Sequence, residues 1–397
     1  MNKLLFVQCS TNLINKGNIK DVADVFYNSI YDLKAKDGYY KGVDFWEVPL
    51  WIAEISGSFK DYNKELYILN DVNEAIKAIE QKRVDYILLS VLEVNKAFYL
   101  ELINNYKGNA IFLIGGYVNF SEFKNFKNVK IFNSIKELTE SFNIVYEHKT
   151  DYSLFKGLKI IPRLNLSTGC LNKCKFCTIE KDLKEFSLKD IINQAISFKD
   201  LNFKLVYLND KTFGQAKNHI FLKYAYNVIK KNNPEFKGFI VQTTASQALK
   251  TGFIAELKLY NVAIVELGLE SFNNDILKGL KKPHNIEQVK KAVNLLNESG
   301  IKVILNIIIG LIGEDKITYD NTLNYIKENV SKIYSLNIYN LAIYNNTELF
   351  NEVKTNNADD LNELKAEKSF YNQEAILNNK YFYDNIFNLG IEILKRG

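Results

Sequence analysis

Three of the four cysteines in this 397-residue chain lie within eight residues, at Cys170, Cys174 and Cys177. A disulfide framework would spread its cysteines along a short secreted chain, so three thiols in one loop indicate metal ligation instead. Three thiolates leave a tetrahedral zinc site one ligand short, but they can hold a [4Fe-4S] cluster through three of its irons and leave the fourth iron open. Spacing alone leaves two alternatives: a structural zinc site with a distant fourth ligand such as Cys9, and a chance group of buried thiols.

The cysteine spacing resembles the hallmark of the radical S-adenosylmethionine superfamily, C-x3-C-x2-C with an aromatic residue before the last cysteine, here Phe176. The resemblance covers most of residues 160–345. It implies an oxygen-sensitive [4Fe-4S] cluster that donates one electron to S-adenosylmethionine. The resulting 5′-deoxyadenosyl radical abstracts hydrogen from an unactivated position of a substrate. An electron donor such as flavodoxin or ferredoxin is implied as a partner.

Further residues follow the family's pattern at strand ends. Gly268-Leu269-Glu270-Ser271 matches its Gly-x-Glu-Ser pattern, and the fifth strand carries Ile308, Gly310 and Glu314, with Asn306 where the family usually has a glycine. By this resemblance, the residues expected to bind S-adenosylmethionine are Phe176, Asp210, Gln242, Glu270, Ser271, Asn306 and Ile308. No acid, base or radical relay stands out among the many Tyr, Lys and Asn side chains, so no catalytic residue is assigned.

The elements that must position these residues alternate along the chain. Aliphatic strands are expected at 164–168, 204–210, 238–244, 262–268, 302–310 and 332–341. Helical patterns between them are expected at 187–199, 216–232, 247–259, 285–299 and 316–329. Six such units in a row predict a partial (β/α)6 TIM barrel rather than an open sheet. Because barrel enzymes keep their chemistry at the carboxyl ends of the strands, the cysteine loop is expected at the catalytic mouth.

The first 145 residues also alternate, which predicts a parallel sheet covered on both faces, a flavodoxin-like doubly wound fold. Its buried strands are expected at 3–8, 43–48, 84–90, 109–116 and 130–132. Helices are expected at about 18–36, 71–82, 95–106 and 134–142. The predicted organisation is a cobalamin-binding-like domain at 1–146, a linker at 147–160, the barrel at 161–345 and a helical C-terminal region at 346–397.

The N-terminal segment resembles the cobalamin-binding subfamily of the same superfamily, in which one strand ends in Ser and the next in Gly-Gly. Here the matching residues are Ser90 in VDYILLS and Gly115, Gly116 and Tyr117 in LIGGY. The resemblance implies cobalamin as a cofactor and methyl transfer to a carbon of a small molecule or peptide, or a cobalamin-assisted rearrangement or cyclisation.

Three other readings of the chain stay open. A methylthiotransferase that modifies tRNA or protein would carry three further cysteines for a second cluster, and only Cys9 is available. The N-terminal domain could also be a scaffold without a ligand, or the whole chain a non-enzymatic metal-binding interaction protein.

Composition narrows the class of protein further. The net charge of +5 is small, and only three of the 51 basic residues are arginine, which argues against a nucleic-acid partner. Lys, Asn or Asp interrupts every apolar run before it reaches the ~20 residues of a membrane span. The apolar run in MNKLLFVQ is too short for a secretory signal, so a cytoplasmic protein is expected.

Overall fold

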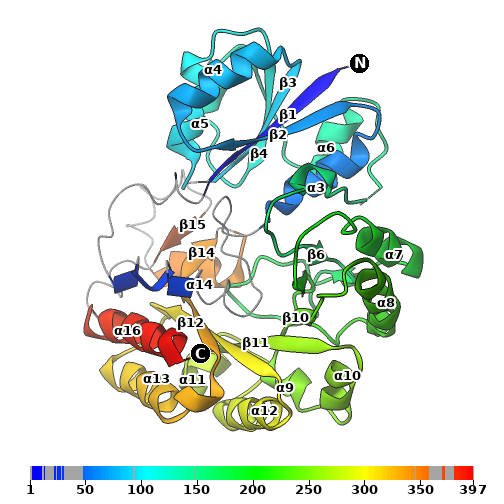
Figure 1. The fold of residues 1–397 in the computed structure, drawn as a ribbon. Helices are drawn as coiled ribbons and strands as arrows, with labels where there is room; N and C mark the ends of the chain where they lie inside the picture. The colour runs from blue at the N-terminus through cyan, green and yellow to red at the C-terminus, as the bar shows by residue number, and fades with distance from the viewer. Residues whose placement is uncertain are drawn as a thin grey trace.

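A computed structural model of the chain shows two parallel sheets, one above the other in Figure 1, each with helices on its outside. The structure describes residues 2–10, 13, 22–23, 25–27, 29–30, 48–92, 94–147, 149–344, 346–356, 369–371 and 380–396. No helix within these ranges is both long enough and apolar enough to cross a membrane.

The N-terminal sheet is parallel and has the strand order β2-β1-β3-β4-β5. Its strands are β1 (Lys3–Cys9), β2 (Asn63–Leu69), β3 (Tyr86–Val91), β4 (Ile111–Gly116) and β5 (Val129–Ile131). This is the order of a flavodoxin-like fold, as predicted. Its strands alternate between two apolar cores: Leu4 and Phe6 face one, whereas Leu5 and Val7 face the other.

Helices cover both faces of this sheet (Figure 1). They are α3 (Leu50–Ser58), α4 (Val72–Lys82), α5 (Lys96–Asn105) and α6 (Ile135–Glu140), with a 3-10 turn, η1 (Glu122–Asn125). The pair α4 and α5 packs on one face, and α3 and α6 pack on the other. Side-chain caps start two of them, since Asp71 accepts from Glu74 N and Ser134 from Glu137 N.

One predicted strand differs from the observed sheet. The second strand is Asn63–Leu69, whereas the expected strand 43–48 lies outside the described residues except for Val48, as does most of the expected helix 18–36. The sequence NKELYIL has two charged residues and sits at the sheet edge, beside β1 only. Edge strands need no continuous apolar run, which is why the pattern did not reveal it.

The second sheet is the predicted partial barrel, with order β13-β12-β11-β10-β9-β6. Its strands are β6 (Arg163–Leu164), β9 (Leu205–Leu208), β10 (Gly238–Thr243), β11 (Val262–Glu270), β12 (Lys302–Ile309) and β13 (Ser335–Asn340). All pair in parallel, and the edge strands β6 and β13 do not pair with each other, so the barrel is open at one side.

Helices alternate with these strands on the outside of the barrel (Figure 1). They are α7 (Leu188–Ile196), α8 (Leu222–Asn232), α9 (Ala245–Ala248), α10 (Phe253–Leu259), α11 (Asn274–Gly279), α12 (Ile286–Glu298) and α13 (Lys316–Glu328). Short 3-10 turns join some of the elements: η2 (Ser153–Phe155), η3 (Lys217–Phe221) and η4 (Val330–Lys332). Each predicted helical pattern corresponds to one or two of these elements.

The described residues of the C-terminal part are mostly helical, as expected, and form α14 (Glu348–Asn356) and α16 (Lys380–Arg396). The apolar residues of α16 pack on the barrel, where Phe382 stacks on Tyr319 of α13 with ring centroids 4.0 Å apart. An antiparallel pair, β14 (Ala342–Tyr344) and β15 (Ser369–Tyr371), was not predicted.

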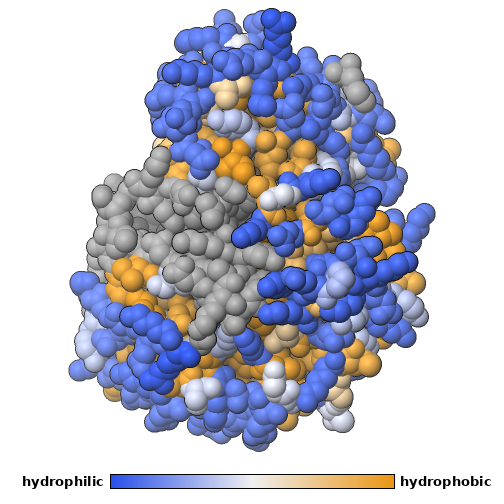
Figure 2. Space-filling model, in the orientation of Figure 1, coloured by the Kyte–Doolittle hydropathy of each residue, from blue (hydrophilic) through white to orange (hydrophobic). Residues whose placement is uncertain are grey.

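The two sheets share one apolar core, which runs from Leu4 and Phe6 in β1 to the barrel helices. Asp151, in the connecting segment, accepts hydrogen bonds from Ser56 Oγ (2.8 Å) and Lys64 Nζ (2.9 Å) of the N-terminal domain. In the face shown by Figure 2, hydrophilic residues cover the outer helices, and hydrophobic atoms come to the surface below the N-terminal sheet. The shared core holds the two domains in contact.

Candidate cluster and cofactor site

The cysteine loop begins where the chain leaves β7 (Ser167–Thr168), just beyond the first barrel strand. An antiparallel hairpin with β8 (Lys184–Glu185) closes the loop, and Cys170 N donates to Glu180 O at 2.9 Å. Gly169 has φ +84°, and a Cβ atom there would lie 1.8 Å from the Asp182 carbonyl oxygen. Only glycine fits this close backbone approach, so the loop's geometry is set at its first residue.

The three clustered thiols lie close enough for Cys170 and Cys177 to act electrostatically on Cys174. Cys170 is buried, with its sulfur 3.4 Å from Thr212 Oγ1, and Cys174 and Cys177 are partly exposed. Burial raises the pKa of Cys174 against the opposing effect of the Lys282 ammonium, and the other two thiols also act on it. No three His, Cys, Asp or Glu side chains of the described ranges converge on a point where one metal ion could bind. A cubane cluster does not require such convergence, because each thiolate binds a different iron.

Cys9 lies apart from this group, in the apolar core beneath α4 and α5. Its backbone N–H donates to Tyr99 OH, and burial raises the pKa of its thiol to about 12. A thiol held protonated in an apolar core is a poor metal ligand. The structure therefore does not bring Cys9 to the cysteine loop as a fourth zinc ligand.

A buried ion pair lies beside the cysteine loop. Lys282 Nζ is 2.7 Å from Glu270 Oε1, and the two side chains are 7% and 9% exposed. The Lys282 ammonium also lies 5.8 Å from the centroid of the Phe176 ring. Although burial disfavours the charged form, Glu270 and the nearby thiols raise the pKa of Lys282 overall. The site thus holds a permanent cation next to three potential thiolates.

The backbone at the end of β11 is arranged around this pair. Glu270 has φ +63°, and the pairing of β11 with β12 shifts register between Gly268 and Glu270. A Cβ atom on Gly268 would lie 2.6 Å from Glu270 Oε1, so the glycine leaves room for the carboxylate. Left-handed backbone at a non-glycine residue is costly and is concentrated at functional sites.

Two buried polar side chains near the pair lack hydrogen-bond partners within the described part of the chain. Ser271 is fully buried and its Oγ has no partner, and neither ring nitrogen of His284 has one. Burial and the neighbouring Lys282 lower the pKa of His284 to about 3, so the imidazole is neutral. Buried polar atoms without partners are rare, and a bound ligand, ion or water can supply the missing hydrogen bond.

Asp210 follows β9, and both of its carboxylate oxygens accept hydrogen bonds from other protein groups. Ser167 Oγ donates to Oδ1 at 2.5 Å, and Leu166 N donates to Oδ2 at 3.1 Å. Burial raises the pKa of this carboxyl to about 6. Asp210 thus ties the strand that enters the cysteine loop to the end of β9.

Gln242 and Asn306 point into the barrel, within a polar belt. Gln242 Nε2 donates to Tyr207 OH, which itself donates to Glu266 Oε2 at 2.9 Å. On the other side of the barrel, Asn337 Nδ2 donates to Asn306 Oδ1 at 2.9 Å. This belt lies above an apolar layer made by Leu205, Ile240, Ile264 and Ile304. Sequence reasoning missed Tyr207, Glu266 and Asn337, although Glu266 interrupts an otherwise aliphatic strand.

Ile308 and Phe176 belong to one apolar cluster at the barrel mouth, with Leu311 and Leu341. After β12 the chain turns at Gly310, and Glu314 accepts from the backbone N–H groups of Gly310 (3.0 Å) and Leu311 (2.9 Å). Burial raises the pKa of Glu314 to about 8. Of the predicted fifth-strand residues, Ile308 thus lines the mouth and Glu314 shapes the turn.

Helix α14 is bonded to the cysteine loop. Leu349 N donates to Lys175 O at 3.1 Å, and Lys175 Nζ is 2.5 Å from Glu352 Oε1. A second, more exposed pair joins Lys281 Nζ and Glu348 Oε1, also at 2.5 Å. The loop is therefore held between the barrel and a helix whose Glu352 lies 177 residues after Lys175.

The N-terminal domain has a cavity of about 440 Å³ between the sheet, α3 and α6. All four residues predicted to contact cobalamin line it: Ser90, Gly115, Gly116 and Tyr117. Gly116 has φ +133°, and a Cβ atom there would lie 1.9 Å from the Val91 carbonyl oxygen. The structure thus brings these four residues to the rim of one cavity at the carboxyl edge of the sheet.

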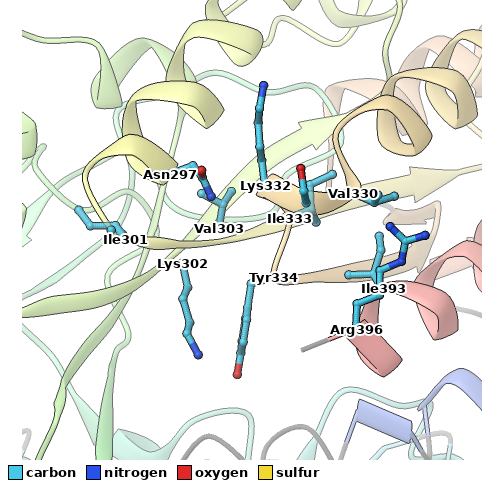
Figure 3. A pocket seen from close by; sticks show the side chains of 12 residues that line it. Asn297, Ile301, Lys302, Val303, Val330, Lys332, Ile333, Tyr334, Ile393 and Arg396 are labelled. Atoms are coloured by element: carbon cyan, nitrogen blue, oxygen red, sulfur yellow. The ribbon is translucent and has the colours of Figure 1, made fainter.

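A second cavity, of about 450 Å³, lies at the amino end of the barrel strands, away from the cysteine loop. In Figure 3, Lys302 and Tyr334 project together to one side, with the ammonium 4.2 Å from the ring centroid, whereas Lys332 projects to the other. Its charged groups do not converge, so this cavity lacks the arrangement of a catalytic site.

Most of the barrel is similar to a known family. Residues 164–326 match the family model of the Radical SAM superfamily. A putative methylthiotransferase of Methanocaldococcus jannaschii is 26% identical over 171 residues, 40% of this chain and 37% of that protein. The anaerobic magnesium-protoporphyrin IX monomethyl ester cyclase of Rubrivivax gelatinosus is 23% identical over 49% of this chain and 35% of its own length. The chain thus spans less than half the length of these two relatives.

Two solved structures share the fold over both domains. The radical S-adenosylmethionine methyltransferase TsrM from Kitasatospora setae aligns with a TM-score of 0.62 and 12% identity, covering 90% of this chain and 77% of that one. The cobalamin-dependent S-adenosylmethionine radical enzyme OxsB aligns with a TM-score of 0.57 and 15% identity, covering 90% of this chain and 61% of that one. At such identities the likeness establishes the fold.

Proposed function

We propose that this chain is a cobalamin-dependent methyltransferase that acts on an unactivated carbon of a small molecule or peptide, on the strength of the match of residues 164–326 to the Radical SAM superfamily. The observation that carries the proposal is the grouping of three thiols at the barrel mouth beside a buried cation and an unpartnered Ser271. A small redox protein such as flavodoxin or ferredoxin is the proposed electron donor.

Cys170, Cys174 and Cys177 would hold a [4Fe-4S] cluster, which when bound supplies one electron for the reductive cleavage of S-adenosylmethionine. Lys282 would stabilise the thiolates and attract the methionine carboxylate, because its charge is buried and fixed in place. Glu270 and Ser271, which end β11, would reach the ribose and the methionine head group. Ile308 and Phe176 would shield the mouth from water.

The polar belt inside the barrel, below the mouth, would orient the substrate. Gln242, Asn306 and Asn337 present amide groups to the barrel interior, and their partners Tyr207 and Glu266 fix one side of that arrangement. Amides donate and accept hydrogen bonds without carrying charge. This belt suits a polar, neutral part of a small molecule or peptide.

The N-terminal cavity supports the cobalamin part of the proposal. Its rim brings together Ser90, Gly115, Gly116 and Tyr117, and Gly116 allows a backbone approach that no other residue permits. The shared fold with two cobalamin-dependent enzymes is consistent with this placement.

The test of the cluster is anaerobic reconstitution with iron and sulfide, followed by electron paramagnetic resonance with and without S-adenosylmethionine. The wild type should contain about four irons per chain, and its reduced signal should change when the nucleotide is added. Cys170→Ala should lose the signal, whereas Cys9→Ala should keep it. A reconstituted cluster whose signal ignores S-adenosylmethionine would overturn the enzyme proposal.

The curated relative from Methanocaldococcus jannaschii favours a second candidate, methylthiotransfer. That reaction would use a second cluster in the N-terminal domain, and the sequence offers only Cys9 there, a buried thiol with a pKa of about 12. An iron content near eight per chain, reduced by half in Cys9→Ala, would support this candidate in place of the first.

A further inference from the structure

The hydroxyl of Thr212 lies against the sulfur of Cys170. Thr212 belongs to the segment that follows β9, and its Oγ1 is 3.4 Å from Cys170 Sγ. Both residues are buried, with exposed fractions of 6% and 7%, so the contact is largely shielded from solvent. A hydrogen bond to sulfur in such surroundings is stronger than the same bond in water.

The partners of the Thr212 hydroxyl fix the direction of this contact. Asn172 Nδ2 donates to Thr212 Oγ1 at 3.2 Å and so takes one acceptor position of the hydroxyl. A cysteine that binds a metal is a thiolate and has no hydrogen to donate. The single hydrogen of the hydroxyl therefore points to Cys170 Sγ whenever Cys170 is a cluster ligand.

The segment around Thr212 is held from two sides. Thr243 Oγ1, at the end of β10, donates to Phe213 O at 3.1 Å. Gln215 Oε1 accepts from Leu171 N at 2.9 Å, which ties the same segment to the cysteine loop. A donor fixed in this way does not have to reorganise when the charge on the sulfur changes.

We propose that Thr212 is a positioning residue that acts through Cys170 to raise the reduction potential of the cluster. The inference rests on the proposed function, because it requires a [4Fe-4S] cluster held by Cys170. Hydrogen bonds to the ligand sulfurs are among the factors that set the potential of such a cluster. The reduced form gains more from the Thr212 hydroxyl, because one added electron makes the sulfur ligands more negative. The electron comes from the proposed redox protein, and the Thr212 proton stays on its own oxygen.

The test is stepwise reduction of the reconstituted protein without S-adenosylmethionine, with the midpoint potential followed by electron paramagnetic resonance. Thr212→Val removes the hydroxyl at nearly constant side-chain size, and Thr212→Ser keeps it. The matched control is Thr243→Val, because Thr243 Oγ1 donates to the same segment, but to a carbonyl oxygen rather than to sulfur.

At a fixed potential, Thr212→Val should shift the ratio of oxidised to reduced cluster about tenfold towards the oxidised form, which is about 59 mV for a one-electron couple. Thr212→Ser should keep the wild-type potential. Thr243→Val should also keep it and should lower only the melting temperature of the cluster-free protein. If Thr212→Val holds no cluster, Thr212→Ala removes the same hydroxyl with a smaller side chain and gives the same comparison.

Three results would overturn the inference while the cluster itself stands: an unchanged potential in Thr212→Val, an equal shift in Thr212→Ser, or an equal shift in Thr243→Val. Loss of the cluster in both Thr212→Val and Thr212→Ala would also overturn it, because Thr212 would then act in cluster assembly rather than on the potential. If the reconstituted wild type holds no [4Fe-4S] cluster, the proposed function fails, and the inference fails with it.

Discussion

The ion pair between Lys282 and Glu270 gives the sharpest prediction about the barrel mouth. In Lys282→Met, a carboxylate that is 9% exposed loses its cation, which lies 2.7 Å away in the wild type. Removing one partner of a buried ion pair typically costs about 3–5 kcal/mol, because the other charge stays buried without compensation. This is a large part of the about 5–15 kcal/mol that stabilises a typical domain.

The neighbouring lysine is a matched control. Lys281 pairs with Glu348 at 2.5 Å, but those side chains are 48% and 44% exposed. An exposed pair contributes about 0–1 kcal/mol, so Lys281→Met should change stability little. The two variants remove the same charge one residue apart, and burial is the main difference between them.

Equilibrium urea unfolding of the cluster-free protein, followed by circular dichroism, measures both variants. Lys282→Met should lower the unfolding midpoint strongly, and Glu270→Gln combined with Lys282→Met should recover most of the loss because no unpaired charge remains. If Lys282→Met and Lys281→Met cost the same, or if the double variant is no more stable than Lys282→Met, the reasoning from burial is wrong.

Three further predictions concern other contacts. Gly157→Ala, at φ +84° in open space, should cost about 1–3 kcal/mol through backbone strain alone. Gly116→Ala should cost more, because a Cβ atom there would also lie 1.9 Å from the Val91 carbonyl oxygen; thermal melting compares the two variants. Although burial alone would raise the pKa of Asp151, hydrogen bonds lower this pKa to about 2. Asp151 should therefore contribute about 1–2 kcal/mol to the free energy of unfolding above pH 4, and this contribution should be lost as the pH falls towards 2. In Asp151→Asn, the free energy of unfolding should depend less on pH in this acid range. Glu352→Gln should speed iron loss to a chelator several-fold by releasing Lys175, unlike the surface variant Glu287→Gln.

Local sequence patterns predicted much of the architecture. Short, mostly aliphatic runs of three to ten residues between helical patterns predicted both parallel sheets, because strands buried on both faces need continuous apolar character. The pattern failed at Asn63–Leu69, where an edge position admits Lys64 and Glu65. It also left helix α3 unassigned, although residues of α3 line the N-terminal cavity.

By itself, the sequence determined that three thiols share one short loop after a strand, since Cys170, Cys174 and Cys177 are too close in the chain to be separated. Only the tertiary structure decided what surrounds them: Lys282 beside Glu270, Glu352 on Lys175, and the polar belt inside the barrel. It also showed that the Asp210 carboxylate accepts hydrogen bonds from Ser167 Oγ and Leu166 N. Spacing along the chain constrains neighbours within a loop, whereas burial and charge partners depend on strands that meet only when the sheet forms.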